Sequence, residues 1–123
     1  MTIANECFDV IICSHVLEHI PADRAAMKEL ARVLRPDGVA YIQVPLNSDL
    51  LQTDEDPGIV DPKERNRRFG QFDHVRVYGR DFEDRLREAG FAVTEIRTSA
   101  MLSTVKMNRL GLWDDVIWRC KRR

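Results

Sequence analysis

Two histidines and a glutamate occupy a stretch of five residues that directly follows an apolar run. His15, Glu18 and His19 are side-chain types that can transfer protons or bind a metal ion. Their spacing is formally that of the inverted zinc-protease motif, in which two histidines bind zinc and the glutamate is the base. That mechanism needs all three residues in one regular helix, whereas here they follow a strand-like run and precede Pro21. The sequence therefore predicts no metal site, and a metal hydrolase is the least favoured function.

A turn is the alternative setting for two of these residues. Because polar side chains next to a strand end often bind nearby backbone groups, Glu18 and His19 could simply satisfy such groups at a strand-to-helix turn. The sequence leaves both interpretations of this pair open.

A second set of chemically capable side chains, His74, Arg76 and Tyr78, lies near the end of residues 46–78. This segment has no sustained apolar period, and a connection of this length in a compact domain is usually a lid, a binding loop or disordered. Connectors that only link two elements seldom concentrate these residue types. The segment is therefore predicted to be a long loop or lid that could close over a substrate, with an exposed solvated loop as the alternative.

The elements that must position these side chains form an alternating pattern. Residues 8–13 are short, β-branched and nearly all apolar, which is typical of a strand covered on both faces. Apolar residues at helical spacing predict an amphipathic helix over residues 22–34, and residues 39–44 predict a second strand. Strand, helix and strand over this length predict a parallel, right-handed βαβ unit.

The second half of the chain predicts one helix and two strands. The helix begins after Asp81 and ends at Gly90, since aspartate favours the start of a helix and glycine its end. The strands cover residues 91–96 and 116–120, and a short helix could lie within the ambiguous residues 101–112.

Composition narrows the possible partners. The 123 residues are 44% hydrophobic and 32% charged, as expected for one globular domain. A formal net charge of -1 gives no overall field to hold a nucleic acid. The longest apolar run, residues 10–13, is too short to span a membrane, and the first residues lack a secretory pattern. Three widely spaced cysteines suit reduced thiols, so we expect a cytoplasmic protein.

Four segments together resemble a known family. Residues 8–21 (FDVIICSHVLEHIP) and 29–38 (ELARVLRPDG) resemble the fourth strand, following helix and fifth strand of class I S-adenosylmethionine-dependent methyltransferases of type 11. Residues 69–79 and 86–91 resemble one bacterial branch of that family. The resemblance implies a single α/β domain over residues 1–123. It would be a partial Rossmann-like sheet, strands four to seven with flanking helices, mostly parallel with an antiparallel final strand.

The same resemblance assigns roles near the first strand. It places Ser14 against the methionine part of S-adenosylmethionine, with His15 and Leu17 lining that pocket, and it lets His19 pin the turn. A base is needed only if the methyl acceptor must lose a proton.

The resemblance also suggests residues on the acceptor side. The candidate bases are His15 and His74, and Arg76 and Tyr78 would contact a small-molecule acceptor.

The cofactor-binding first half of the family pattern is missing from these residues. None of the six glycines forms a Gly-x-Gly pair, which the family uses to bring backbone close to the cofactor. We therefore expect a truncated half domain with little independent activity, and weak or absent cofactor binding by this chain alone. A homodimer, or a chain supplying the missing half, is the expected partner. The alternative is a non-catalytic dimeric interaction module derived from a methyltransferase fold.

Overall fold

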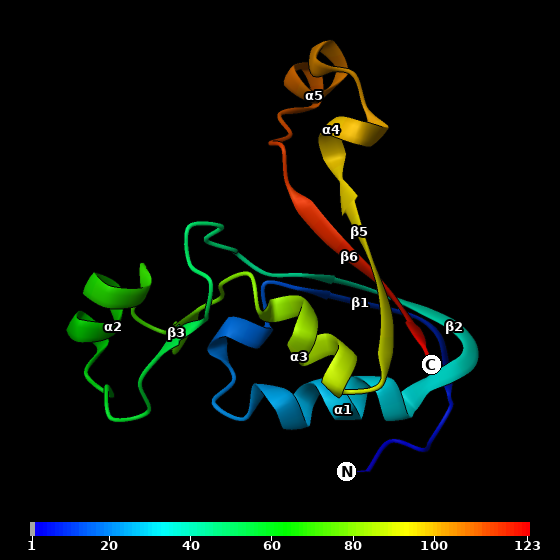
Figure 1. The fold of residues 1–123 in the computed structure, drawn as a ribbon, viewed down its shortest axis with the longest axis horizontal. Coiled ribbons are helices and arrows are strands. Elements are labelled where there is room, and N and C mark those ends of the chain that lie inside the picture. The colour runs from blue at the N-terminus through cyan, green and yellow to red at the C-terminus, as the bar shows by residue number, and fades with distance from the viewer. Residues whose placement is uncertain (1) are drawn as a thin grey trace.

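Strands and helices alternate along most of the chain in this computed structural model, which describes residues 2–123 (Figure 1). The elements, in chain order, are β1 (Phe8–Ser14), η1 (Leu17–His19), α1 (Asp23–Val33), β2 (Leu34–Gln43), β3 (Asp54–Glu55), α2 (Pro62–Phe69), β4 (Arg76–Val77), α3 (Phe82–Glu88), β5 (Phe91–Arg97), α4 (Thr98–Met101), α5 (Thr104–Leu110) and β6 (Val116–Arg122).

The main sheet has the strand order β1-β2-β6-β5. Strands β1 and β2 pair in parallel, and β6 is antiparallel to both β2 and β5. Three strands therefore run in one direction and only the final strand runs against them, which confirms the predicted fold class. The last strand in sequence lies between two earlier ones.

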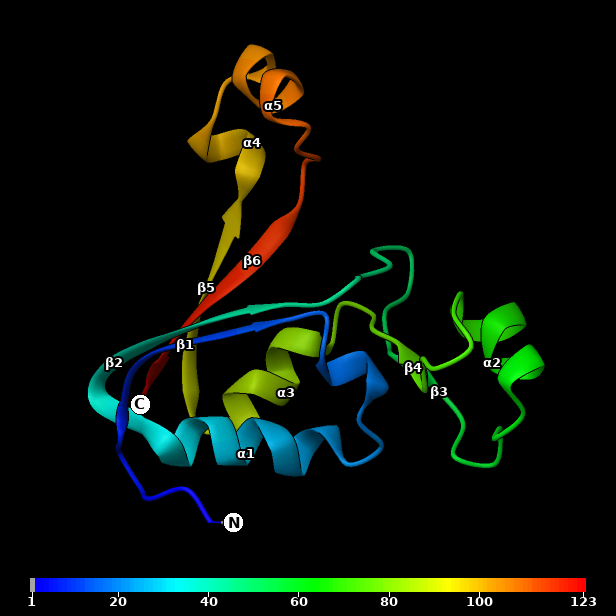
Figure 2. The ribbon, with the colours of Figure 1, turned by 180° about the vertical axis from the view of Figure 1, so that it is seen from behind.

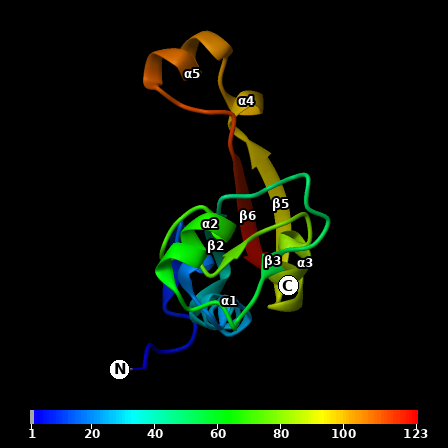
Figure 3. The ribbon, with the colours of Figure 1, turned by 90° about the vertical axis from the view of Figure 1, so that its left-hand side faces the viewer.

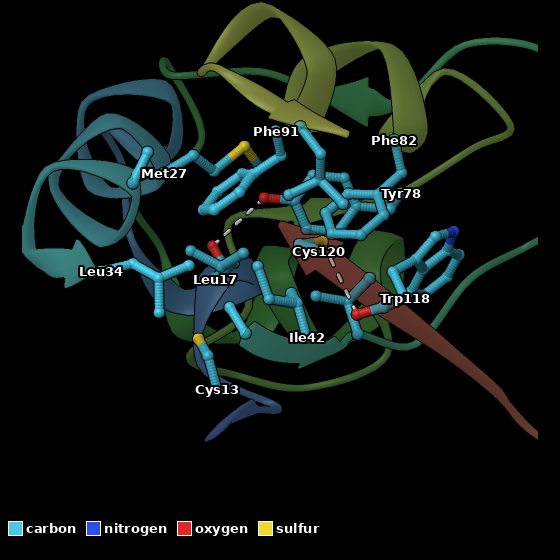
Figure 4. Close-up of a cluster of buried hydrophobic side chains, with 14 residues drawn as sticks. Cys13, Leu17, Met27, Leu34, Ile42, Tyr78, Phe82, Phe91, Trp118 and Cys120 are labelled. Carbon is cyan, nitrogen blue, oxygen red and sulfur yellow. Dashed lines mark hydrogen bonds between the residues drawn. The ribbon is translucent and has the colours of Figure 1, made fainter. Parts of the chain in front are cut away.

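Helices α1 and α3 lie together on one side of this sheet (Figures 1 and 2). In α1, Met27 and Ala31 are buried while Lys28 is exposed, so the amphipathic period predicted from the sequence faces the sheet. Figure 4 shows the core, in which Phe82 contacts Tyr78 and Trp118 with ring centroids 4.6 and 4.7 Å apart. Burying a large apolar side chain contributes about 2 kcal/mol, so the packing of these rings stabilises the fold.

The opposite face of the sheet is open at β1. Ile11 and Cys13 point toward the core, whereas Val10 and Ile12 alternate with them and are 54% and 77% exposed. The residues predicted as a strand covered on both faces therefore have only one face covered by the described residues. This face of β1 is therefore an apolar surface in contact with solvent.

Strand β2 begins earlier than the sequence indicated. It starts at Leu34, directly after α1, and its pairing with β1 is irregular between Leu34 and Val39. Gly38 permits this path, because a Cβ atom there would lie 2.8 Å from the carbonyl oxygen of Asp9. Arg35 also bonds the Asp9 carboxylate at 2.9 Å.

The segment predicted as a long loop contains a helix and a pair of short strands. Asp61 accepts a hydrogen bond from the Lys63 backbone N–H, Pro62 fills the first helical position, and Gly70 ends α2 with a φ of 90°. These are ordinary start and stop signals, so local sequence builds α2 without an apolar stripe.

Helices α4 and α5 stand at the far end of the β5–β6 hairpin, away from α1 and α3 (Figures 1 and 3). Helix α5 lies within residues 101–112, whose structure the sequence left ambiguous, and α4 ends at the first residue of that region. Trp113, which follows α5, is 84% exposed. In the described part of the chain, every helix is too short or too polar to cross a membrane.

Candidate functional site

The turn after β1 sits where ligands bind in open α/β sheets, just beyond the carboxyl ends of parallel strands. The Ser14 hydroxyl donates to the Gln43 side chain at 3.0 Å, and the His15 N–H donates to the Gln43 carbonyl at 2.9 Å. His15 has a φ of 56°, a conformation uncommon outside glycine. The bend turns the chain sharply off the strand, and the three-residue helix η1 follows.

One arginine, Arg76, stabilises this turn. Arg76, only 2% exposed, donates to the carbonyls of Leu17 (2.9 Å), Ile20 (2.6 Å) and Pro21 (2.8 Å). Leu17 begins η1, and its carbonyl also accepts from the Ile20 N–H, whereas the Ile20 and Pro21 carbonyls follow this helix. The position of the turn therefore depends on β4, more than fifty residues later in the sequence.

A buried ionic cluster, formed by Asp23, Glu55, Arg76, Arg85 and Tyr78, surrounds this arginine. The Asp23 carboxylate accepts from the Tyr78 hydroxyl at 2.7 Å and from Arg85 at 2.8 Å. Arg76 lies 3.5 Å from Glu55, and Arg85 bonds the same glutamate. The cluster joins α1, β3, β4 and α3.

The cluster shifts the pKa values of Asp23 and Tyr78 in opposite directions. Burial alone would raise the pKa of Asp23, but hydrogen bonds from Tyr78 and Arg85, with the charges of Arg76 and Arg85, outweigh it and lower that pKa. Burial raises the pKa of Tyr78, and the hydrogen bond to Asp23 raises it further. Tyr78 therefore stays protonated and Asp23 stays ionised at neutral pH.

Three predicted site residues are placed in the interior. Leu17 and Tyr78 are 1% and 0% exposed and belong to the core cluster, and Arg76 supports the turn. The structure thus gives the Leu17 and Tyr78 side chains packing and bonding roles. The Arg76 side chain bonds the turn and also borders a cavity of about 270 Å³ beside η1.

The remaining histidine candidates, His15 and His74, both lie near Glu18. Glu18 lies 3.7 Å from His15 and 3.6 Å from His19, measured between ring nitrogens and its Oε1. Its ligand atoms also gather within 4.8 Å of those of His19 and His74. His74 is buried and borders the same cavity as Glu18. His15, Glu18 and His19 do not share one regular helix, because η1 begins only at Leu17. The sequence predicted this.

Sequence reasoning missed Gln43 and Asp115. Gln43 bonds Ser14 on one side and Asp115 on the other, so the three form a chain across the edge of the sheet. The end of a second parallel strand was a signal for Gln43, whereas the position of Asp115 depends on β6 entering the sheet beside β2.

Comparison with known proteins identifies the family. Residues 4–96, three quarters of the chain, match the family described as "Methyltransferase domain". The chain belongs to this methyltransferase family. The resemblance seen in the sequence, to class I S-adenosylmethionine-dependent enzymes, is thereby confirmed. A comparison with curated proteins found no match.

Solved structures share the fold of this methyltransferase domain at low identity. They include the [4+2]-cyclase SpnF (TM-score 0.65, 13% identity, 99% of this chain and 53% of that chain covered). A Burkholderia thailandensis 1,6-didemethyltoxoflavin-N1-methyltransferase, solved with S-adenosylhomocysteine, has a TM-score of 0.62, 17% identity and coverage of 98% and 46%. A putative Haloferax volcanii methyltransferase in complex with the Trm112 activator has a TM-score of 0.60 and 13% identity, with 99% of this chain and 57% of that chain covered. The methyltransferase domain described here spans about half the length of each.

Proposed function

We propose that this methyltransferase domain contributes the methionine side of an S-adenosylmethionine site and the adjoining acceptor pocket. The observation that carries the proposal is the turn of residues 14–19, which lies at the carboxyl edge of β1 and β2 within the matched family segment. Ser14 and His15 are exposed there, so both are available to a ligand. When bound, the cofactor supplies an electrophilic methyl group on a sulfonium.

The chain's own residues would align the acceptor and exclude water, which are the main requirements of an in-line methyl transfer. The cavity beside η1 has an apolar wall that includes Phe69 and Leu46, and His74 and Glu18 also line it. We propose His74, with His15 as the second candidate, as the base for an acceptor that must lose a proton. Arg76 would meet a small-molecule acceptor at the cavity wall.

We propose further that the adenosine side of the cofactor is bound by residues outside these 123, in a segment or partner chain that supplies the missing half. The six glycines supply no Gly-x-Gly loop. The Haloferax volcanii neighbour is solved in complex with a methyltransferase activator, which supports the proposal of a partner chain. The three cysteines are free and suit a reducing compartment, so we place the protein in the cytoplasm.

A titration with S-adenosylhomocysteine followed by ¹H–¹⁵N NMR tests the proposal. We expect amide shifts confined to residues 14–17 and the neighbouring Gln43, with a dissociation constant weaker than about 100 µM. Adenosine alone, which lacks the methionine part, should not shift these amides.

Matched serine variants serve as controls. Ser14→Val should weaken the shifts, and Ser99→Val, at an exposed serine of α4, should leave them unchanged. Shifts located elsewhere, or none at millimolar ligand, would contradict the methyltransferase site. Micromolar affinity, about -8 kcal/mol, would instead show that this chain carries a complete site.

A non-catalytic dimeric interaction module is the second candidate. The observation in its favour is the open apolar face of β1, where Ile12 is 77% exposed. Self-association without any response to the cofactor analogue would favour the module.

A further inference from the structure

The buried side chain of Glu18 has no hydrogen-bond partner among the described residues. Its side chain is 2% exposed, and neither carboxylate oxygen has a hydrogen-bond partner among residues 2–123. The nitrogens of His15 and His19 lie 3.7 and 3.6 Å away, beyond hydrogen-bond range. Burying a carboxylate without a partner costs several kcal/mol, so this position calls for a cation.

The nearby arginines do not supply that cation. Arg76 and Arg85 are matched in number by Asp23 and Glu55 within the buried ionic cluster. The terminal nitrogens of Arg76 are already used on backbone carbonyls. Among residues 2–123, the Glu18 carboxyl group therefore has no unmatched arginine as its partner.

Two imidazoles converge on the same carboxylate. Ligand atoms of Glu18, His19 and His74 all lie within 4.8 Å of one another. Zinc binds imidazole nitrogen and carboxylate oxygen at about 2.0–2.2 Å, which separates neighbouring ligand atoms by roughly 3.5 Å. Small side-chain rotations would close the cluster around one ion. The hydrogen bond from the Val75 N–H to the Glu18 carbonyl, at 2.9 Å, holds the two segments in place.

The ring of His19 is already oriented as a metal ligand would be. Its Nδ1 lies 3.2 Å from the Asp73 carbonyl oxygen and 3.3 Å from the Asp73 carboxylate. This contact fixes the proton on Nδ1 and leaves Nε2 facing Glu18. Metal-binding histidines characteristically donate their second nitrogen to a carbonyl or carboxylate in this way.

We propose that Glu18, His19 and His74 bind one divalent transition-metal ion of the class that prefers imidazole with carboxylate, such as Zn²⁺. Three protein ligands leave a coordination position open, and the cavity of about 270 Å³ lined by Glu18 and His74 gives access to it. An ion there would polarise an oxygen or nitrogen of a molecule in the cavity. The site goes beyond the proposed methyltransferase function, because it needs no cofactor. With the ion bound, His74 is a ligand, and His15 is the base for an acceptor that must lose a proton.

Zinc titration of the metal-stripped chain by isothermal calorimetry tests the site. We expect one Zn²⁺ per chain with a dissociation constant of about 1 µM or tighter. His74→Ala and Glu18→Gln should each weaken binding by at least about tenfold, or 1.4 kcal/mol. Co²⁺ should show the visible absorption of a low-coordinate nitrogen and oxygen site, and this band should be lost in both variants. Neither measurement uses S-adenosylmethionine.

His15→Asn is the matched control. It removes the one histidine of the three that lies outside the cluster, and asparagine tolerates the positive φ at this position. Binding should therefore persist in this variant. Absence of binding at 100-fold higher Zn²⁺ (about 100 µM,) would overturn the proposal, as would equal loss in His15→Asn and His74→Ala. Zn²⁺ should also raise the melting temperature of the wild type but not of Glu18→Gln, which keeps the side-chain shape.

Discussion

Asp23 is the residue on which several elements depend. It begins α1, yet its carboxylate bonds Tyr78 beyond β4 and Arg85 in α3. Those contacts keep its pKa below the ordinary value despite burial. A lowered carboxyl pKa adds stability above the unfolded pKa of about 3.9, and that stability is lost as the pH falls through the folded value.

Asp23→Asn should lower the free energy of unfolding at pH 7 by about 3 kcal/mol, since it leaves Arg85 with one partner fewer in the interior. The wild type should lose stability as the pH falls below about 4, and the variant should lose less over that range. Urea denaturation at pH 7 and pH 3 measures both effects. Asp37→Asn, at an exposed residue, should change stability by less than about 0.5 kcal/mol. A midpoint equal to that of the wild type would contradict the role of Asp23.

The proximity of His74 to Glu18 was beyond prediction from sequence. The turn after residues 8–13 was identifiable as a binding site because its residue types follow a recognisable strand. His74 is 56 positions further on, and its place is set by the pairing of β3 with β4 and by the hold of Arg76 on η1. Contacts of this kind come from tertiary packing, which leaves no local pattern.

Elements with an apolar period were predicted, and those without one were not. Strands β1, β5 and β6 and helices α1 and α3 lie where the sequence indicated, within a few residues. Helix α2 was missed because it is polar on nearly every side. Its caps at Asp61 and Gly70 were nevertheless legible. Strands β3 and β4 have two residues each, too few for any period.

Because its caps define α2, they should control its stability. Asp61→Ala removes the side chain that accepts from the Lys63 N–H and should cost about 1 kcal/mol. Hydrogen exchange of the α2 amides should then become about fivefold faster. Asn66→Ala, at an exposed position in the same helix, should leave exchange unchanged or slower. Equal acceleration in both variants would show that α2 is not governed by its cap.

The molecule as a whole has a covered and an open side. Strand β1 pairs only with β2 among the described residues, and its outward side chains, Val10 and Ile12, are exposed. Edge strands with apolar faces favour pairing with another chain. This supports the proposed dimer, in which two β1 edges meet around a twofold axis.

Ile12→Lys should weaken self-association without damaging the core, because Ile12 points away from α1 and α3. Sedimentation at low micromolar concentration should give twice the chain mass of 14.3 kDa for the wild type and a larger share of single chains for the variant. Ala25→Lys, on the exposed side of α1, is the matched control. A wild type that remains single at high concentration would contradict the dimer.

The central place of β6 constrains how the protein can be made on the ribosome. Among the described residues, strand β5 pairs only with β6 in the sheet, and β6 is the last element in chain order. During synthesis, the β1–α1–β2 unit can form early because its partners are close in sequence. Strand β5 then has to wait, unpaired, until Val116–Arg122 leaves the exit tunnel and enters between it and β2. The nascent chain therefore passes through a stage in which β2 and β5 each expose an unpaired edge. Strand β6 pairs with both edges in one late step.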